Sequence, residues 1–403
     1  MPYVAAGAVR WDSHLVRVLC STTANDGHFG PMLPFARACA SAGHEVRVAA
    51  PESFGAALAR AGLPHELFDD VPPDLVGPIM ATLPTLSFEE ANDVVVRQVF
   101  ARLDAQAALP GLLETVGRWR PDVILRETAE LGSLAVAERA GIPHVHVCIG
   151  MHEVASLFAA TISEPLDELG RLAGVADGRL AAALAGETVL SLVPALLDDT
   201  AGASAAPDGF HRFHEPAGTT RAQRPAAWGD PDLPLVYVTF GSVTGSLPPF
   251  AGVFREALDA LAGLDARVVM TVGRKVDPDG LAPVPANALV EQWLPQETVL
   301  AHAAAVLGHG GFGTTMGAAA AGVPQVVAPL FSFDQVVNGD RVAAVGAGLT
   351  TVRGDDVVAR AAAQVPRLLD DPAYAEAARR VAAAMLELPP PSEAVALVEA
   401  LAG

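Results

Sequence analysis

Strand and helix patterns alternate along this chain, which restricts the folds that it can adopt. An apolar, β-branched run at 16–20 is followed by a small polar stretch, a helix pattern at 31–43 and a second strand pattern at 45–49. Such a unit of about 30 residues is typical of parallel strands joined by a helix. Further strand patterns at 121–127 and 142–150 continue the alternation. The chain is therefore predicted to be an α/β protein with parallel sheets covered on both faces.

The alternation stops at 200–232, a stretch rich in Gly, Ala and Pro, and restarts with the strand pattern at 233–242. We therefore predict an N-terminal domain at 15–199, a linker at 200–232 and a C-terminal domain at 233–403, each resembling a Rossmann domain. The last helix is able to cross back to the first domain. A chain of 403 residues is too long for one ordinary core, which also favours two domains.

Composition excludes several classes of protein. Hydrophobic residues make up 51% of the chain, so it is not largely disordered, and a net charge of −20 disfavours a nucleic-acid partner. Cys20, Cys39 and Cys148 lie in apolar patterns and are expected to be buried thiols in a reducing compartment. We find neither a signal peptide pattern nor a membrane-spanning run, so a cytoplasmic protein without a membrane span is expected.

The strongest candidate ligand loop is VLGHGGFGTTMG at 306–317, where a strand runs into glycines and then into a helix. Glycines allow an anion to approach the backbone closely, and free N–H groups at a helix start attract it. His309, Thr314 and Thr315 add donors, so a diphosphate is the expected ligand. The alternative is a turn in which Gly311 and Gly313 serve only packing.

Three other loops follow predicted strands, where open α/β sheets bind ligands. Ser242 follows one strand and could contact a phosphate, or it could form a bare turn. Asp334 and Gln335 pair an acceptor with a donor, as sugar hydroxyls require, or they are solvated loop residues. His28 follows the first strand, and Glu127 ends another. This pair could act as a base and its orienting carboxylate, or His28 could be only a cap or packing residue.

Together these loops resemble a known family. The segment WLPQETVLAHAAAVLGHGGFGTTMGAAAAGVPQVVAPLFSFDQVVN at 293–338 resembles the nucleotide-sugar signature of GT-B glycosyltransferases, closest to the bacterial natural-product (antibiotic, macrolide and enediyne) branch related to the UDP-glycosyltransferase superfamily. VTFGS and TTANDGHFGPMLPFARA extend the resemblance over most of the chain. It implies two Rossmann-like domains that face each other across a cleft, with the acceptor in the N-terminal domain and the nucleotide-sugar in the C-terminal domain.

The resemblance also implies roles for individual residues. His28 would be the general base with Glu127 behind it, and no metal would be required. Trp293, Leu294 and Gln296 would bind the nucleobase of the donor. Asp334 and Gln335 would bind the hydroxyls of its sugar. The diphosphate would be bound by Ser242, His309, Gly311, Gly313, Thr314 and Thr315.

Three departures from the family pattern stand out. Glu127 stands where Asp is commoner. Gly317 replaces the ribose-binding Glu of the plant enzymes, which favours a dTDP-sugar over the alternative, a UDP-sugar. The interval between Trp293 and His309 is also shorter than in those enzymes.

The acceptor is expected to lie against apolar loops at 69–95 and 150–165, with Phe88, Met151 and Phe158 as wall residues; the alternative is ordinary loops over a core. The function expected from the resemblance is inverting transfer of a (deoxy)sugar to a hydroxyl of a hydrophobic natural-product aglycone, with no permanently bound cofactor. A nucleotide-sugar epimerase and a catalytically silent sugar-nucleotide-binding auxiliary protein are the alternatives. A homodimer is compatible with the sequence.

Overall fold

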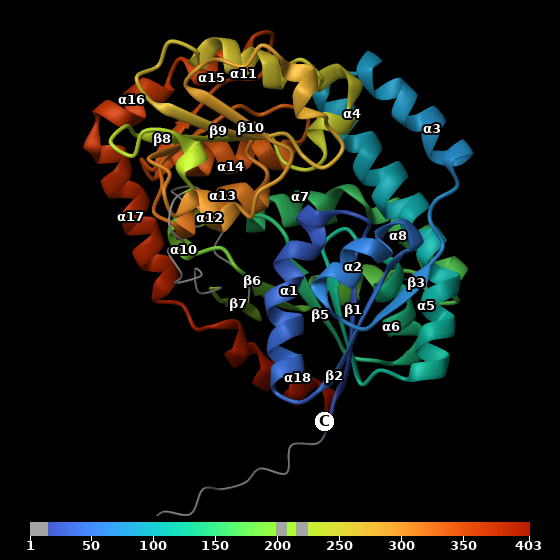
Figure 1. Cartoon of the computed structure of the whole chain (residues 1–403). Coiled ribbons are helices and arrows are strands. Elements are labelled where there is room, and N and C mark those ends of the chain that lie inside the picture. The colour runs from blue at the N-terminus through green and yellow to red at the C-terminus, as the bar shows by residue number, and fades with distance from the viewer. Residues whose placement is uncertain (1–14, 199–207, 215–224) are drawn as a thin grey trace, which may run out of the picture.

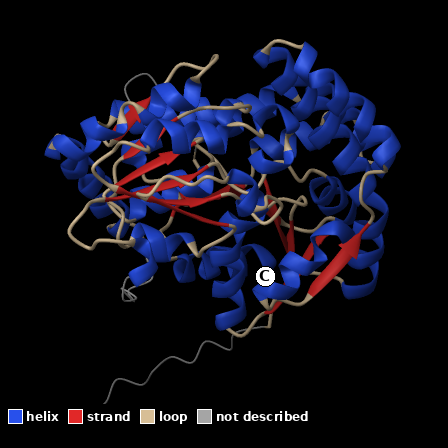
Figure 2. Cartoon of the chain, turned by 45° about the horizontal axis from the view of Figure 1, so that its top comes forward, coloured by secondary structure: helices blue, strands red, loops and turns tan. Residues whose placement is uncertain are grey.

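The computed structural model describes residues 15–198, 208–214 and 225–403. They form two parallel sheets, each packed between helices (Figures 1 and 2). The prediction of an α/β protein with two Rossmann-like domains is confirmed.

The N-terminal sheet has the strand order β3-β2-β1-β4-β5-β6-β7, and every adjacent pair is parallel. Its strands are β1 (Arg17–Ser21), β2 (Glu45–Pro51), β3 (His65–Phe68), β4 (Val123–Glu127), β5 (His144–Cys148), β6 (Thr188–Ser191) and β7 (Phe210–Arg212). β4 is buried along its whole length because helices cover both of its faces.

Helices of this domain include α1 (Asp26–Ser41), α2 (Gly55–Ala61), α3 (Pro73–Thr82), α4 (Phe88–Val94), α5 (Ala105–Trp119), α6 (Gly132–Ala140), α7 (His152–Thr161), α8 (Ser163–Ala173), α9 (Arg179–Ala185) and α10 (Ala195–Asp198). A π-helix, η3 (Val95–Asp104), joins α4 to α5. The predicted loops at 69–95 and 150–165 are therefore largely helical. The Ser87 capping box that starts α4 is one local reason.

The C-terminal sheet has the order β10-β9-β8-β11-β12-β13 and is also parallel. Its strands are β8 (Leu235–Thr239), β9 (Arg267–Thr271), β10 (Ala288–Glu291), β11 (Ala305–Gly308), β12 (Gln325–Val327) and β13 (Gly348–Thr350). Its helices include α11 (Val253–Leu261), α12 (Gln296–Leu300), α13 (Phe312–Ala320), α14 (Phe333–Ala344), α15 (Val357–Ala362), α16 (Val365–Asp370) and α17 (Pro372–Leu386).

The domains meet through the ends of the sheets that carry the loops. Helix α1 contacts α13, and α7 contacts α14. One apolar cluster contains residues of both domains, including Met151 and Val193 from the first and Phe312 and Val337 from the second. The carboxyl ends of the two sheets therefore face each other.

The predicted linker at 200–232 contains ordered elements. Residues 199–207 and 215–224 lie outside the described residues, but Phe210–Arg212 forms the edge strand β7, which pairs with β6. Trp228 is buried against the C-terminal sheet. The treatment of 210–212 as linker was wrong, because three residues are too few to give a periodic strand pattern.

The chain ends on the first domain. In Figure 1, α17 runs along the C-terminal domain, and α18 (Ala394–Ala402) lies beneath α1, which it contacts. The segment Pro372–Ala402 is long and apolar enough to cross a membrane by length and composition alone. Here Val381 packs in the cluster shared by the domains and Val398 packs in the N-terminal core, as in core helices of globular proteins.

Candidate active site

His28 and Glu127 meet at the centre of the N-terminal sheet. Nδ1 of His28 lies 3.0 Å from Oε1 of Glu127, so the additional methylene of Glu127 does not prevent contact. The hydroxyl of Thr23 lies 2.9 Å from the same nitrogen and donates to Oε1 at 3.1 Å. The backbone N–H groups of Thr23 and Ala129 also donate to the carboxylate. With Nδ1 oriented in this way, Nε2 is left to act on a ligand.

Local sequence explains why these side chains converge. β1 and β4 are neighbours at the point where the strand order reverses, the position at which such sheets bind ligands. Asn25 caps α1 by accepting the N–H of Gly27 at 2.8 Å. The helix therefore begins at Asp26, before the predicted 31–43, and His28 lies in its first turn.

Charge controls the protonation of this pair. Burial by itself would lower the pKa of His28, but the charge and hydrogen bond of Glu127 outweigh it, so the pKa is raised above its ordinary value. Burial opposes ionisation of Glu127 as well, yet His28 and the backbone donors hold the pKa of Glu127 below its ordinary value. The two groups thus favour an imidazolium–carboxylate pair.

A buried ion pair supports the strand end that carries Glu127. The guanidinium of Arg126 is fully buried and binds both carboxylate oxygens of Glu187, with Nε 2.7 Å from Oε1. Its Nη1 donates to the carbonyl of Glu127 at 3.1 Å. Nδ1 of His144 lies 2.8 Å from Oε1 of Glu187. The hydrogen bond from Arg126 therefore fixes the backbone of Glu127.

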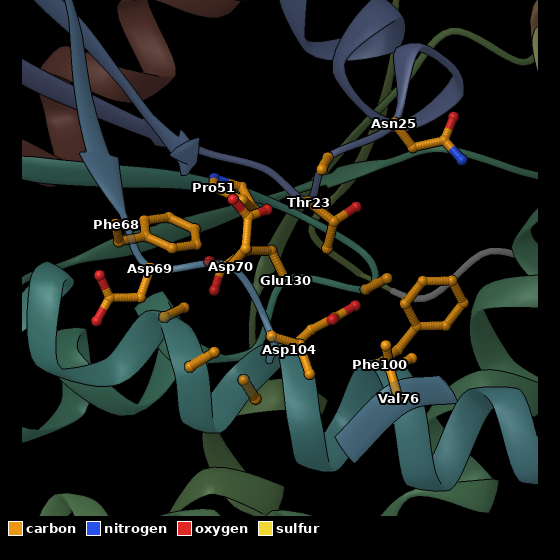
Figure 3. Close-up of a pocket in the computed structure, with 16 residues that line it drawn as sticks. Thr23, Asn25, Pro51, Phe68, Asp69, Asp70, Val76, Phe100, Asp104 and Glu130 are labelled. Carbon is orange, nitrogen blue, oxygen red and sulfur yellow. The ribbon is translucent and has the colours of Figure 1, made fainter. Parts of the chain in front are cut away.

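A cavity of about 250 Å³ lies close to the dyad, and Figure 3 shows the residues that line it. Thr23, which is within hydrogen-bond distance of both His28 and Glu127, lines the cavity, and so does Phe100, whose ring lies 5.5 Å from the His28 ring. Pro51, Phe68, Val71, Val76, Phe100 and five alanines supply apolar lining, and Asp69, Asp70, Asp104 and Glu130 supply carboxylates. Burial is the main reason that the pKa of Asp104 is raised to about 7. The cavity suits a largely apolar molecule that carries polar groups.

The glycine-rich loop lies at the matching reversal point of the C-terminal sheet, between β8 and β11. Gly311 precedes α13, and no side chain caps this helix among the described residues. The ring of His309 packs beside Gly241 and Gly311, where an added Cβ would come within 3 Å of it. Its Nδ1 is buried without a hydrogen-bond partner, and burial lowers its pKa to about 4. A neutral histidine and free helix N–H groups thus share one loop.

Gln296, which begins α12, joins the segment predicted to bind the nucleobase to α13. Its Nε2 donates to the carbonyl of Gly313, and its Oε1 accepts from the hydroxyl of Thr314, both at 3.1 Å. The side chain fills the space over Gly317, where an added Cβ would lie 2.2 Å from Nε2. Thr315 is placed differently, because its buried hydroxyl donates to the carbonyl of Gly311 inside the helix. That side chain is turned away from any ligand at the loop.

The remaining donor candidates lie on the loops around this helix. The ring of Trp293 is half exposed, and the guanidinium of Arg274 lies 4.1 Å from its centroid. Leu294, next to it, packs against the neighbouring core. Ser242 is exposed on a loop against Gly273.

Asp334 and Gln335 begin α14. Oε1 of Gln335 accepts the N–H groups of Leu330 and Phe331, so only its amide nitrogen remains for a ligand. Burial raises the pKa of Asp334, and the charge of His28 partly offsets that shift.

The predicted acceptor wall at 69–95 and 150–165 overlaps the observed cavity only in part. Met151 is fully buried in the cluster between the domains, and Phe158 packs against the N-terminal core. The ring of Phe88 lies 3.8 Å from the guanidinium of Arg353 in the C-terminal domain. None of these three residues lines the cavity, although Asp69, Asp70, Val71 and Val76 of the predicted segment 69–95 do.

Family models match both halves of the chain. The N-terminal domain model of the erythromycin biosynthesis protein CIII-like family matches residues 37–167, and its C-terminal domain model matches residues 255–401. The chain belongs to this family. It is therefore a nucleotide-sugar glycosyltransferase of the natural-product branch of the UDP-glycosyltransferase superfamily, as the resemblance predicted.

Curated relatives of this CIII-like glycosyltransferase agree over almost the whole chain. The L-demethylnoviosyl transferase of Streptomyces niveus is 30% identical over 94% of this chain and 96% of its own. The elloramycin glycosyltransferase ElmGT of Streptomyces olivaceus is 31% identical, with the same coverage.

Solved structures agree with the fold. The calicheamicin glycosyltransferase CalG4 has a TM-score of 0.77, with 26% identity over 96% of this chain and 98% of its own. The spinosyn rhamnosyltransferase SpnG complexed with thymidine diphosphate has the same TM-score, with 25% identity over 95% of this chain and all of its own.

Several residues of the glycosyltransferase site escaped the sequence analysis. Thr23 was inside a quoted motif but had no role. Phe100 and Asp104 lie on a π-helix, for which the sequence offers no periodic signal. Arg126 adjoins Glu127, and a charged residue in an otherwise apolar strand was an available signal. Arg274 lies outside the family motif altogether.

Proposed function

We propose that this enzyme is an inverting glycosyltransferase that moves a (deoxy)sugar from a dTDP-sugar to a hydroxyl of a hydrophobic natural-product aglycone. The observation that carries the proposal is the contact of His28 with Glu127 beside a cavity. Glu127 and Thr23 engage Nδ1, so Nε2 is the base. The apolar lining with carboxylates suits a hydrophobic aglycone that carries hydroxyls.

In the proposed reaction, Nε2 of His28 takes the proton of the acceptor hydroxyl as its oxygen forms a bond to the anomeric carbon. The bond from that carbon to the phosphate oxygen breaks on the opposite face, and its electron pair stays on the nucleotide diphosphate. Glu127 stabilises the resulting imidazolium by charge and hydrogen bond.

The start of α13 would stabilise the negative charge that develops on the departing diphosphate. Its first N–H groups have no partners within the helix, and the helix dipole favours an anion there. Nδ1 of His309 is buried and has no hydrogen-bond partner among the described residues, so it is available to bond a ligand at this loop. Thr314 can turn its hydroxyl from Gln296 to a phosphate, whereas Thr315 would contribute only through its backbone position.

The choice of dTDP rests on two observations. Gln296 fills the space over Gly317, so the position cannot hold a larger ribose-binding side chain while Gln296 stays in place. The similar SpnG was solved with thymidine diphosphate, and a relative from Streptomyces peucetius is named a TDP-daunosamine transferase. Asp334 and the amide of Gln335 would bind hydroxyls of the sugar.

The test is incubation of the purified enzyme with a dTDP-sugar and a panel of hydroxylated aromatic and macrolide aglycones. The expected result is an aglycone that gains the mass of one sugar, with inverted anomeric configuration by NMR. A donor that changes configuration without any acceptor would instead favour an epimerase. Binding of dTDP without turnover of any acceptor would favour an auxiliary protein.

A further inference from the structure

One side chain of the N-terminal domain contacts the loop that leads into the donor-sugar residues. Asn92, on α4, accepts the backbone N–H of Phe333 through Oδ1 at 2.9 Å. Its Nδ2 donates to the carbonyl of Phe331 at 3.4 Å and to that of Phe88, one turn earlier in α4, at 2.8 Å. An amide offers both a donor and an acceptor, so one residue engages two backbone groups of the other domain.

A second contact between domains lies beside the first. The guanidinium of Arg353 stacks on the ring of Phe88 and donates twice to the carbonyl of Leu330, at 3.1 and 3.2 Å. Helix α4 therefore approaches the loop at 330–333 with both a hydrogen-bonding residue and an aromatic ring.

The opposite side of this loop is held by Gln335. Its Oε1 accepts from the N–H groups of Leu330 and Phe331. Asn92 bonds the same loop at Phe331 and at Phe333, which directly precedes Asp334. The positions of Asp334 and Gln335 thus depend on a loop that is fixed partly by their own domain and partly by α4.

We propose that Asn92 is a positioning residue for the donor sugar: it sets the loop so that Asp334 and Gln335 face the sugar when α4 is docked. This inference rests on the proposed function and deepens it. Among the described residues Asn92 makes no hydrogen bond to His309 or to the start of α13. The ring of Phe331 lies 6.2 Å from that of His309, but Asn92 bonds only the backbone carbonyl of Phe331. Asn92 is therefore expected to affect recognition of the sugar and not of the nucleotide.

The experiment compares Asn92→Ala with Asp93→Ala. Asp93 is the next residue of α4, is half exposed and pairs only loosely with Arg97 at 4.0 Å, so it is a matched control. The dissociation constants of dTDP-glucose and of dTDP alone are measured by calorimetry for both variants and for the unmodified enzyme. KM for the donor and kcat are measured with the best acceptor, and thermal unfolding checks that each variant is folded.

For Asn92→Ala we expect binding of dTDP-glucose to weaken by about two- to tenfold, the usual range for one hydrogen bond. Binding of dTDP should stay unchanged. The KM for the donor should rise in parallel with the dissociation constant of dTDP-glucose. Unchanged binding of both ligands, or equal weakening of both, would overturn the inference while leaving the proposed function intact. Failure of the unmodified enzyme to bind both dTDP-glucose and dTDP would overturn the inference and the proposed function together.

Discussion

Nδ1 of His28 lies 3.0 Å from Oε1 of Glu127, and the Thr23 hydroxyl lies within hydrogen-bond distance of both. The three residues come from the helix after one strand, the end of the neighbouring strand, and the loop between strand and helix. Because the carboxylate is completely buried and already accepts two backbone N–H groups, it can rotate little. The imidazole is therefore held in one orientation before any substrate arrives.

Replacement of His28 by alanine should abolish most turnover. A positioned base contributes about 10²- to 10⁴-fold, so kcat should fall by at least that range. Among the described residues His28 contacts Thr23, Glu127 and Phe100 and makes no hydrogen bond to the glycine-rich loop, so calorimetry should show dTDP binding close to that of the unmodified enzyme. Turnover within a few-fold of normal would rule out His28 as the base.

Replacement of Glu127 by glutamine should move the pH profile in a definite direction. The charge of Glu127 raises the pKa of His28, and the base must be neutral to accept a proton. The acid limb of kcat/KM in the unmodified enzyme should therefore lie above the ordinary histidine value of 6.5. In Glu127→Gln that limb should shift to lower pH, and the plateau rate should fall because the imidazolium loses its counter-charge.

Rates measured from pH 5 to pH 9 check this prediction. Glu127→Asp is the conservative control, since it keeps the charge and shortens the side chain by one methylene. The acid limb of its kcat/KM profile should stay closer to that of the unmodified enzyme. A shift to higher pH in Glu127→Gln would contradict the assignment.

The two neighbouring threonines of α13 should differ in their effect on nucleotide binding. Thr314→Ala removes a hydroxyl that can reach a phosphate, and a hydrogen bond to a charged group contributes about 1.5–3 kcal/mol, or roughly 10- to 100-fold in Kd. The Thr315 hydroxyl already donates within the helix, so Thr315→Ala should change Kd for dTDP only slightly. Equal weakening in both variants would show that both hydroxyls reach the ligand.

The buried pair of Arg126 and Glu187 should matter for stability and for its pH dependence. Arg126→Met leaves a buried carboxylate without its main partner, which typically costs about 3–5 kcal/mol. The pKa of Glu187 in the folded protein is about 2, below its ordinary value of 4.5, so the stabilisation is complete above 4.5 and is lost as the pH falls toward 2.

Urea unfolding at pH 7 and at pH 4 measures both effects. Arg126→Met should be destabilised more at pH 7 than at pH 4, because protonation relieves the unpaired charge. The double variant Arg126→Met/Glu187→Leu should recover much of the loss, since a well-packed apolar pair replaces the ions. An equal loss in the single and double variants would point to packing alone.

Sequence patterns predicted the strands β1, β2, β4, β5 and β8, whose runs are apolar and at least five residues long. The strands β3, β6 and β7 were missed, because a run of three or four residues carries little periodic signal. The start of α1 was placed too late because Pro31 was taken as a first-turn residue, whereas Asn25 caps the helix six residues before it. Local chemistry at a helix end outweighed a proline preference.

The candidate site was foreseen to the extent that strand ends supply it. His28 and Glu127 follow neighbouring parallel strands, and a sheet brings such residues together. Phe88, Met151 and Phe158 were judged from apolar composition, which does not distinguish a cavity wall from a surface buried between domains. Asn92 bonds backbone groups of Phe331 and Phe333, about 240 positions away. A contact over such a distance cannot be predicted from a single sequence.

Helix α18 has a consequence for engineering. Ala394, Val395 and Val398 complete the apolar core of the N-terminal domain although they belong to the last turns of the chain. A hybrid enzyme joined within 200–232, made to combine the acceptor range of one parent with the donor of another, would receive α18 from the donor parent. Its acceptor domain would then be packed against a foreign helix, so a second junction before 394 is needed to keep that domain's own core.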